Sequence, residues 1–138
     1  MRPRIVIDTN VIVCAMKSRK GASFKLLSMI DSHKFEPSIS VPLILEYEAI
    51  LKRETKTNAD DIEAIINYVC RVSGKHKIYY LWRPYLKDPK DDMVLELAVA
   101  SQSSIIVTYN RNDYKGVEHF GVKILSPIEF LKQIGEIS

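Results

Sequence analysis

The stretch Arg4-Ile5-Val6-Ile7-Asp8-Thr9-Asn10 says most about how this chain folds. Its β-branched residues, closed by an acid, are typical of a buried parallel strand. In open α/β sheets the reacting groups lie just beyond the carboxyl ends of the strands, which is where Asp8 falls. Asp8 is therefore either the N-cap of a following helix or a ligand, and Asp-Thr-Asn suits both roles.

The composition indicates one globular domain over residues 1–138, because 46% of the residues are hydrophobic and 27% are charged. No apolar run is long enough to cross a bilayer, and Met1 lies almost directly before the first strand. We therefore expect no signal peptide and a cytoplasmic location. Cys14 and Cys70 lie among apolar residues and are expected to be free thiols. The net charge of +3 permits a nucleic-acid partner without requiring one.

Strand and helix patterns alternate along the chain, which predicts an α/β fold with a parallel sheet between helices. Pro42 suits a first helical turn, and Asn58 suits an N-cap. The expected strands are 4–8, 35–41, 77–82, 105–107 and 122–125. The expected helices are 10–16, 22–31, 42–53, 58–73 (ended by Gly74), 91–101 and a short one from 127.

Glu46 is the second informative residue, because it lies in the apolar stripe of the helix that begins at Pro42. Leu43 precedes it by three positions and Ile50 follows it by four, so all three share one face. A carboxylate on a core-facing stripe is costly unless it is paired or binds a metal ion. Glu46 is thus either a metal ligand or one half of a salt bridge.

Two further acidic clusters lie at comparable places in the predicted fold. Asp88, Asp91 and Asp92 precede a predicted helix, so we expect either Asp91 or Asp92 to be its N-cap. Asp113 follows the fourth predicted strand in a polar turn, as Asp8 follows the first. A turn built from Asn and Asp residues would explain that last cluster equally well.

Taken together, these acids are expected to converge. Two carboxylates about 4 Å apart repel by roughly 4 kcal/mol at an effective dielectric constant near 20, so a cluster calls for a cation or a protonated acid. Carboxylate oxygens without a His or Cys cluster suit Mg²⁺ or Mn²⁺ better than zinc. Such ions generate hydroxide from bound water and neutralise negative charge on phosphate, and both effects promote hydrolysis of phosphodiesters.

The order of these motifs resembles that of the PIN-domain ribonucleases over nearly the whole chain. The matching stretches are Ile-Asp8-Thr-Asn, Pro42-x-x-x-Glu46-Tyr, Asp91 before the helix that contains Ala98, and Thr108-x-Asn110-x-x-Asp113-Tyr114. The amino-acid sequence around Glu46 and around Asp91 resembles that of the family branch formed by toxin components of toxin–antitoxin pairs. The resemblance implies a three-layer α/β/α fold with a five-stranded parallel sheet of order 3-2-1-4-5. It also implies RNA cleavage that depends on Mg²⁺ or Mn²⁺.

Carried over residue by residue, the resemblance makes Asp8, Glu46, Asp91 and Asp113 the catalytic acids and metal ligands. Asp91 fits the third place best by its distance from Ala98, although counting back from Thr108 would select Asp92. Asn110 matches a weaker, neutral ligand. Residues that would orient the metal ligands or a water molecule without binding the ion themselves are Thr9, Asn10, Asp92 and Thr108. The resemblance further implies an RNA substrate, a small antitoxin protein as a partner, and a homodimer formed through the helical hairpin 42–72.

Rival interpretations fit the residues less well. A phosphotransferase of the haloacid dehalogenase type needs a second Asp two residues after the first, where this chain has Asn10. A response-regulator receiver needs an acidic pair in the first loop, which is absent. A non-catalytic PIN scaffold that binds RNA or protein is the remaining alternative, and retention of all four acids counts against it. Aromatic residues that could stack on bases, or belong to the core, are Tyr47, Trp82, Tyr109 and Tyr114.

Overall fold

The first predicted strand forms the centre of the sheet. β1 (Arg4–Ile7) pairs in parallel with β2 (Glu36–Ile39) on one side and with β4 (Ile105–Val107) on the other. Its residues Ile5, Val6 and Ile7 are buried, as expected for a strand covered on both faces. β3 (Gly74–Lys75) and β5 (Lys123–Leu125) complete a parallel sheet of order β3-β2-β1-β4-β5, which confirms the predicted topology.

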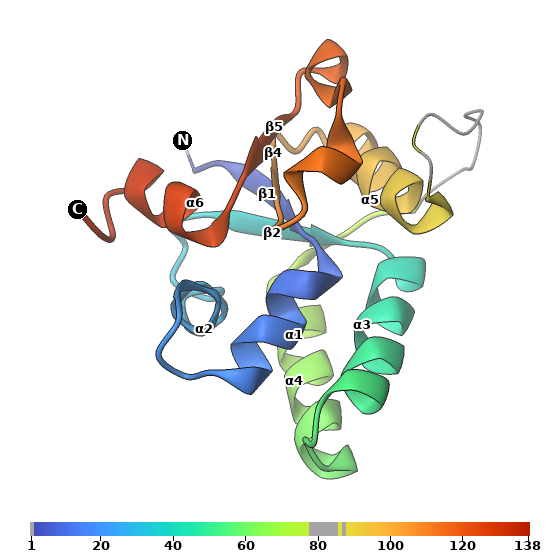
Figure 1. Cartoon of the computed structure of the whole chain (residues 1–138), viewed down its shortest axis with the longest axis vertical. Helices are drawn as coiled ribbons and strands as arrows, with labels where there is room; N and C mark the ends of the chain where they lie inside the picture. The colour runs from blue at the N-terminus through green and yellow to red at the C-terminus, as the bar shows by residue number, and fades with distance from the viewer. Residues whose placement is uncertain (1, 78–85, 87) are drawn as a thin grey trace.

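The computed structural model describes residues 2–77, 86 and 88–138. Helices flank the sheet in a three-layer α/β/α arrangement, as predicted (Figure 1). In that view α1 to α4 gather below the strands, α5 lies to their right, α6 lies to their left, and the segment between β4 and β5 rises above them. The helices are α1 (Thr9–Lys17), α2 (Ala22–Ser28), α3 (Val41–Glu54), α4 (Ala59–Val72), α5 (Pro89–Ala100) and α6 (Pro127–Gln133), with 3₁₀ turns η1 (Arg111–Tyr114) and η2 (Val117–Phe120).

Several predicted boundaries were wrong by a few residues. β2 ends at Ile39 because Ser40 is already the N-cap of α3: its hydroxyl accepts a hydrogen bond from Leu43 N–H. α4 ends at Val72, and Gly74 belongs to β3 instead of closing the helix. Of the strand predicted over 77–82, residues 78–82 lie outside the described part of the chain, and the observed ladder is formed earlier, by Gly74 and Lys75.

The N-cap of α5 is Asp88 and not, as predicted, Asp91 or Asp92. Its carboxylate accepts a hydrogen bond from Lys90 N–H at 2.9 Å. Pro89 in the first helical position explains the choice, because its fixed φ suits that position and leaves the cap to the residue before it. Asp91 and Asp92 consequently lie in the first turn, where their charges suit the helix dipole.

The predicted helix faces form the core. Leu43, Tyr47, Ile50 and Leu51 of α3 are buried, as are Ile62, Ile66 and Val69 of α4 behind the predicted cap Asn58. Both cysteines are free thiols, as predicted. Among the described residues, no helix is long and apolar enough to cross a membrane.

Candidate active site

Parallel pairing of β1 with β4 brings the residues after both strands together. Ile7 pairs with Val107, and Asp8 N–H continues the ladder to the Val107 carbonyl at 2.9 Å. Thr108 is therefore beside Asp8, and its hydroxyl donates to Asp8 Oδ2 at 2.8 Å. The two polar ends of strands that are a hundred residues apart in sequence thus form one locus at the carboxyl edge of the sheet.

Asp8 is both an N-cap and the centre of this locus, so its two predicted alternatives coexist. Its Oδ1 accepts from Thr9 N–H at 2.8 Å, which caps α1. Its Oδ2 accepts from three side chains: Thr108 at 2.8 Å, Tyr114 at 3.0 Å and Asn10 at 3.3 Å. Burial raises the pKa of Asp8, although the hydrogen bonds from Thr108, Tyr114 and Thr9 lower it in part, and the charge of Asp113 raises it further.

Glu46 reaches the locus from α3. Its Oε2 accepts a hydrogen bond from the Thr9 hydroxyl at 2.5 Å, and this bond links Glu46 to the first residue of α1. The predicted salt bridge is present as well, with Lys90 Nζ 4.0 Å from Oε1, but that lysine side chain is 58% exposed. An ion pair of that length and exposure contributes little. The adjacent Tyr47 is fully buried and its hydroxyl donates to the Ile7 carbonyl, which fixes α3 against the end of β1.

Asp91 approaches Asp8 from the first turn of α5. The Tyr114 hydroxyl lies 3.3 Å from Asp91 Oδ1 as well as 3.0 Å from Asp8 Oδ2, so it bridges the two acids. Burial raises the pKa of Asp91 to about 7, with further contributions from the charges of Asp8, Asp113 and Asp88. A carboxyl that titrates near neutrality beside other acids is typical of functional sites.

Asp92 occupies a different environment from Asp91. Its Oδ1 accepts from Leu86 N–H at 2.8 Å, so it fixes the segment that enters α5. Its charge also contributes to the raised pKa of Glu96, after burial. The geometry therefore places Asp91, and not Asp92, beside Asp8.

The turn after β4 completes the locus through its backbone and its charges. Asn110 is exposed, and its N–H donates to the Thr108 hydroxyl at 3.0 Å. Asp113 is exposed in η1, directly before Tyr114, and its charge contributes to the raised pKa of both Asp8 and Asp91. Asn10 braces the turn, since it accepts from Tyr109 N–H at 3.2 Å and donates to the Thr108 hydroxyl at 3.1 Å.

The types of donor atom in this locus suit a divalent cation, although the acids among the described residues do not lie close enough together to form a complete set of ligands. Within residues 2–77, 86 and 88–138, no three His, Cys, Asp or Glu side chains lie close enough to hold an ion by themselves. Neutral hydroxyls separate the acids instead: Tyr114 between Asp8 and Asp91, and Thr9 beside Glu46. The donors are hard oxygens of like charge with one exposed lysine beside Glu46, a set whose chemistry suits Mg²⁺ or Mn²⁺.

Of the aromatic residues left open between base stacking and the core, Tyr114 belongs to the core. It is 1% exposed and contacts two acids, so it cannot stack on a base, and the same holds for Tyr47. Tyr109 is 47% exposed, which leaves that role open to it, and Trp82 lies outside the described residues. The available signal was the position of Tyr114 directly after Asp113, within a turn of otherwise polar residues.

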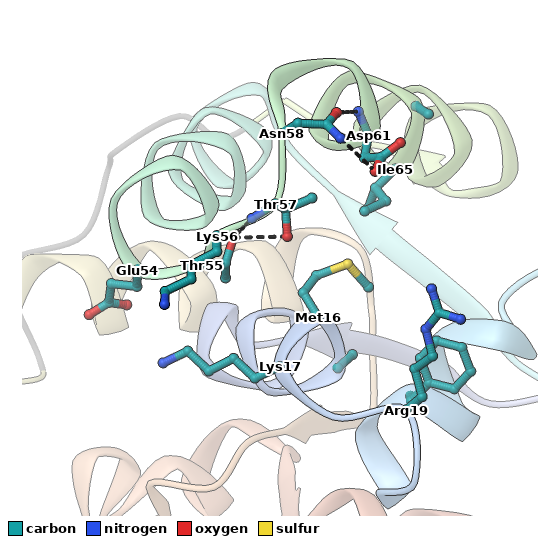
Figure 2. A pocket seen from close by; sticks show the side chains of 13 residues that line it. Met16, Lys17, Arg19, Glu54, Thr55, Lys56, Thr57, Asn58, Asp61 and Ile65 are labelled. Atoms are coloured by element: carbon teal, nitrogen blue, oxygen red, sulfur yellow. Dashed lines mark hydrogen bonds between the residues drawn. The ribbon is translucent and has the colours of Figure 1, made fainter.

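A separate cavity of about 1030 Å³ lies at the far end of α1 (Figure 2). Figure 2 shows Met16 reaching into it from α1, with Lys17, Lys56 and Glu54 on one side and Arg19 on the other. No member of the acidic locus lines this cavity. A nine-residue helix is about 13 Å long, so α1 separates the cavity from the locus at its N-terminus.

Comparisons with known proteins agree with the topology. A family model described as "PIN domain" matches residues 4–112. Among solved structures, the chain is similar to one from the VapBC2 complex of Rickettsia felis bound to a DNA fragment from the promoter. The two share 12% identity with a TM-score of 0.60, over 88% of this chain and 98% of the other. A search of curated proteins found no match.

Proposed function

The chain belongs to the PIN domain family, and from this membership we propose that it is an endoribonuclease that hydrolyses RNA phosphodiesters with Mg²⁺ or Mn²⁺. The observation that supports this most directly is the bridging of two acids from different elements, Asp8 and Asp91, by one buried hydroxyl. A fold that only needed stability would gain nothing from placing like charges there.

In this proposal Asp8, Glu46, Asp91 and Asp113 hold the cation, and Asn110 contributes a neutral oxygen. Thr9, Asn10 and Thr108 orient these acids by the hydrogen bonds described above, while Asp92 fixes the start of α5. A divalent cation bound there would lower the pKa of a water molecule and offset negative charge on the scissile phosphate.

Binding of an RNA substrate is supported by the charge of the chain and by exposed side chains beside the acidic locus. The net charge of +3 permits a negatively charged substrate such as RNA. Lys90 is exposed beside Glu46 and is positioned to contact a phosphate that enters the locus. Tyr109, exposed next to Asn110, offers an aromatic face for a neighbouring base.

We further propose that the chain is the toxin of a toxin–antitoxin pair, with a small antitoxin protein as its partner. Two observations support this: the resemblance of the sequence around Glu46 and Asp91, and the likeness of fold to a chain from a VapBC2 complex. Induced expression of the chain alone should stop growth of a bacterial host, whereas Asp8→Asn should be tolerated. Equal toxicity of the two would contradict the proposal.

The enzymatic proposal is tested with purified protein and single-stranded RNA. Cleavage should occur with Mg²⁺ or Mn²⁺, stop with EDTA, and resume when the ion is restored in excess. Activity that EDTA leaves unchanged would refute the metal dependence. Tight RNA binding without cleavage at any metal concentration would instead favour a non-catalytic scaffold.

A further inference from the structure

Tyr114 holds together two acids from distant parts of the chain. Its hydroxyl lies 3.0 Å from Asp8 Oδ2, which is 106 residues away in sequence, and 3.3 Å from Asp91 Oδ1, which is 23 residues away. Within the four-residue turn η1, Tyr114 is the buried residue, at 1% exposure, while Arg111 and Asp113 are exposed. The turn therefore directs one side chain inward, and that side chain ends between two carboxylates.

The hydroxyl contacts only one oxygen of each acid. On Asp8, Oδ2 accepts from three donors, whereas within the described residues Oδ1 accepts only from the N–H of Thr9. On Asp91, the bond from Tyr114 goes to Oδ1, and within the described part of the chain no hydrogen bond reaches Oδ2. Asp91 thus presents Oδ2, and Asp8 presents Oδ1, which has one donor and keeps a lone pair for a further ligand.

We propose that Tyr114 is a positioning residue for the divalent cation, because its single hydroxyl fixes Asp8 and Asp91 as a pair with one oxygen of each available to the ion. The inference rests on the proposed function, since it concerns the same metal site. Metal ligands whose second oxygen or nitrogen is held by a hydrogen bond bind more tightly, and loss of such a partner typically weakens affinity about 10- to 100-fold.

The proposal places the effect mainly on Asp91. Asp8 keeps its orientation without Tyr114, because Thr108, Asn10 and Thr9 still donate to it. Asp91 has Tyr114 as its side-chain partner among the described residues and would turn freely without it. Removal of the hydroxyl should therefore cost ion affinity by releasing one ligand, while the buried ring of a phenylalanine keeps the packing.

The test compares two buried tyrosines that differ in what their hydroxyls contact. Tyr114→Phe removes the bridge between two acids, whereas the control Tyr47→Phe removes a bond to the Ile7 carbonyl. Mn²⁺ affinity is measured by calorimetric titration of the RNA-free protein, beside melting curves. Tyr114→Phe should bind Mn²⁺ about 10- to 100-fold more weakly than wild type, and Tyr47→Phe should lower Tm but leave Mn²⁺ affinity unchanged.

Equal Mn²⁺ affinity of Tyr114→Phe and wild type would overturn the proposal, as would an equal loss in Tyr47→Phe, which would mean general loosening. Wild-type protein that binds no Mn²⁺ would refute the proposed function itself, so the two failures are distinguishable. Should Tyr114→Phe not fold, a crystal structure of the wild type with Mn²⁺ decides. The Tyr114 hydroxyl within hydrogen-bond distance of both ligating carboxylates supports the proposal, and its displacement from either overturns it.

Discussion

At the scale of single residues, Asp8 shows that a structural and a functional role can share one side chain. Its Oδ1 caps α1 while its Oδ2 gathers three donors, yet burial still raises its pKa. A net raised pKa means that the fold disfavours the charged form, despite all its hydrogen bonds. The negative charge of Asp8 therefore lowers the stability of the metal-free fold.

Asp8→Asn removes that charge at nearly constant shape. Cleavage should fall at least on the order of 100-fold, because a ligand is lost, which exceeds the usual effect of a residue behind the ligands. The metal-free variant should be no less stable than wild type. The amide nitrogen of Asn cannot accept a hydrogen bond, which costs stability, but the removal of one buried negative charge offsets that loss. Melting curves with and without Mn²⁺, beside a cleavage assay, check both parts, and full activity would reduce Asp8 to a cap.

Asp91 predicts a pH dependence with a definite sign. Its pKa is raised from 3.8 to about 7, so between these values the folded chain holds a proton that the unfolded chain has released. Stability of the metal-free protein should therefore fall as pH rises from about 4 to about 7, and this part of the dependence should vanish in Asp91→Asn. Thermal melts in EDTA across that range measure it. Mn²⁺ affinity should change the opposite way, weakening as pH falls below about 7.

At the scale of elements, the central strand β1 and the core face of α3 were predictable from the sequence, whereas several element boundaries and the interior of the turn after β4 were not. The β-branched run before Asp8 and the stripe around Glu46 have clear periods, so the sheet order and two of the acids followed from pattern and resemblance. The turn η1 is four residues long and has no period, so the aromatic ring of Tyr114 among polar residues indicated burial, but nothing showed that its hydroxyl meets two acids. Pro89 did mark Asp88 as the cap of α5, a signal outweighed by the neighbouring acids.

The cap of α5 can be tested separately from the acids that follow it. Asp88→Ala removes the bond to Lys90 N–H and should lower the free energy of unfolding by about 1 kcal/mol. Asp88→Ser keeps a capping oxygen and should remain close to wild type. Urea denaturation of the three proteins checks this, and equal destabilisation by Ala and Ser would show that the charge of Asp88, not its cap, is what matters.

At the scale of the whole molecule, α3 exposes two apolar side chains on one face of its first two turns. Val41 is 71% exposed and Leu45 is 58% exposed, at an i, i+4 spacing that makes them neighbours. They lie at the start of the helical hairpin that the family resemblance associates with a homodimer. Light scattering should give a dimer mass, and Leu45→Asp should give a monomer. A wild-type monomer at high concentration would contradict the predicted dimer.

The sheet order also fixes when the site can exist during synthesis. Asp8 and Glu46 emerge from the ribosome early, but Thr108 and Tyr114 belong to the segment after β4, which follows Glu46 by on the order of several seconds at ordinary rates of translation. A nascent chain can therefore pair β1 with β2 while the locus still lacks its last acid and its bridge. If the chain is the nuclease proposed here, it stays harmless to its own messenger until the segment after β4 has been translated and folded.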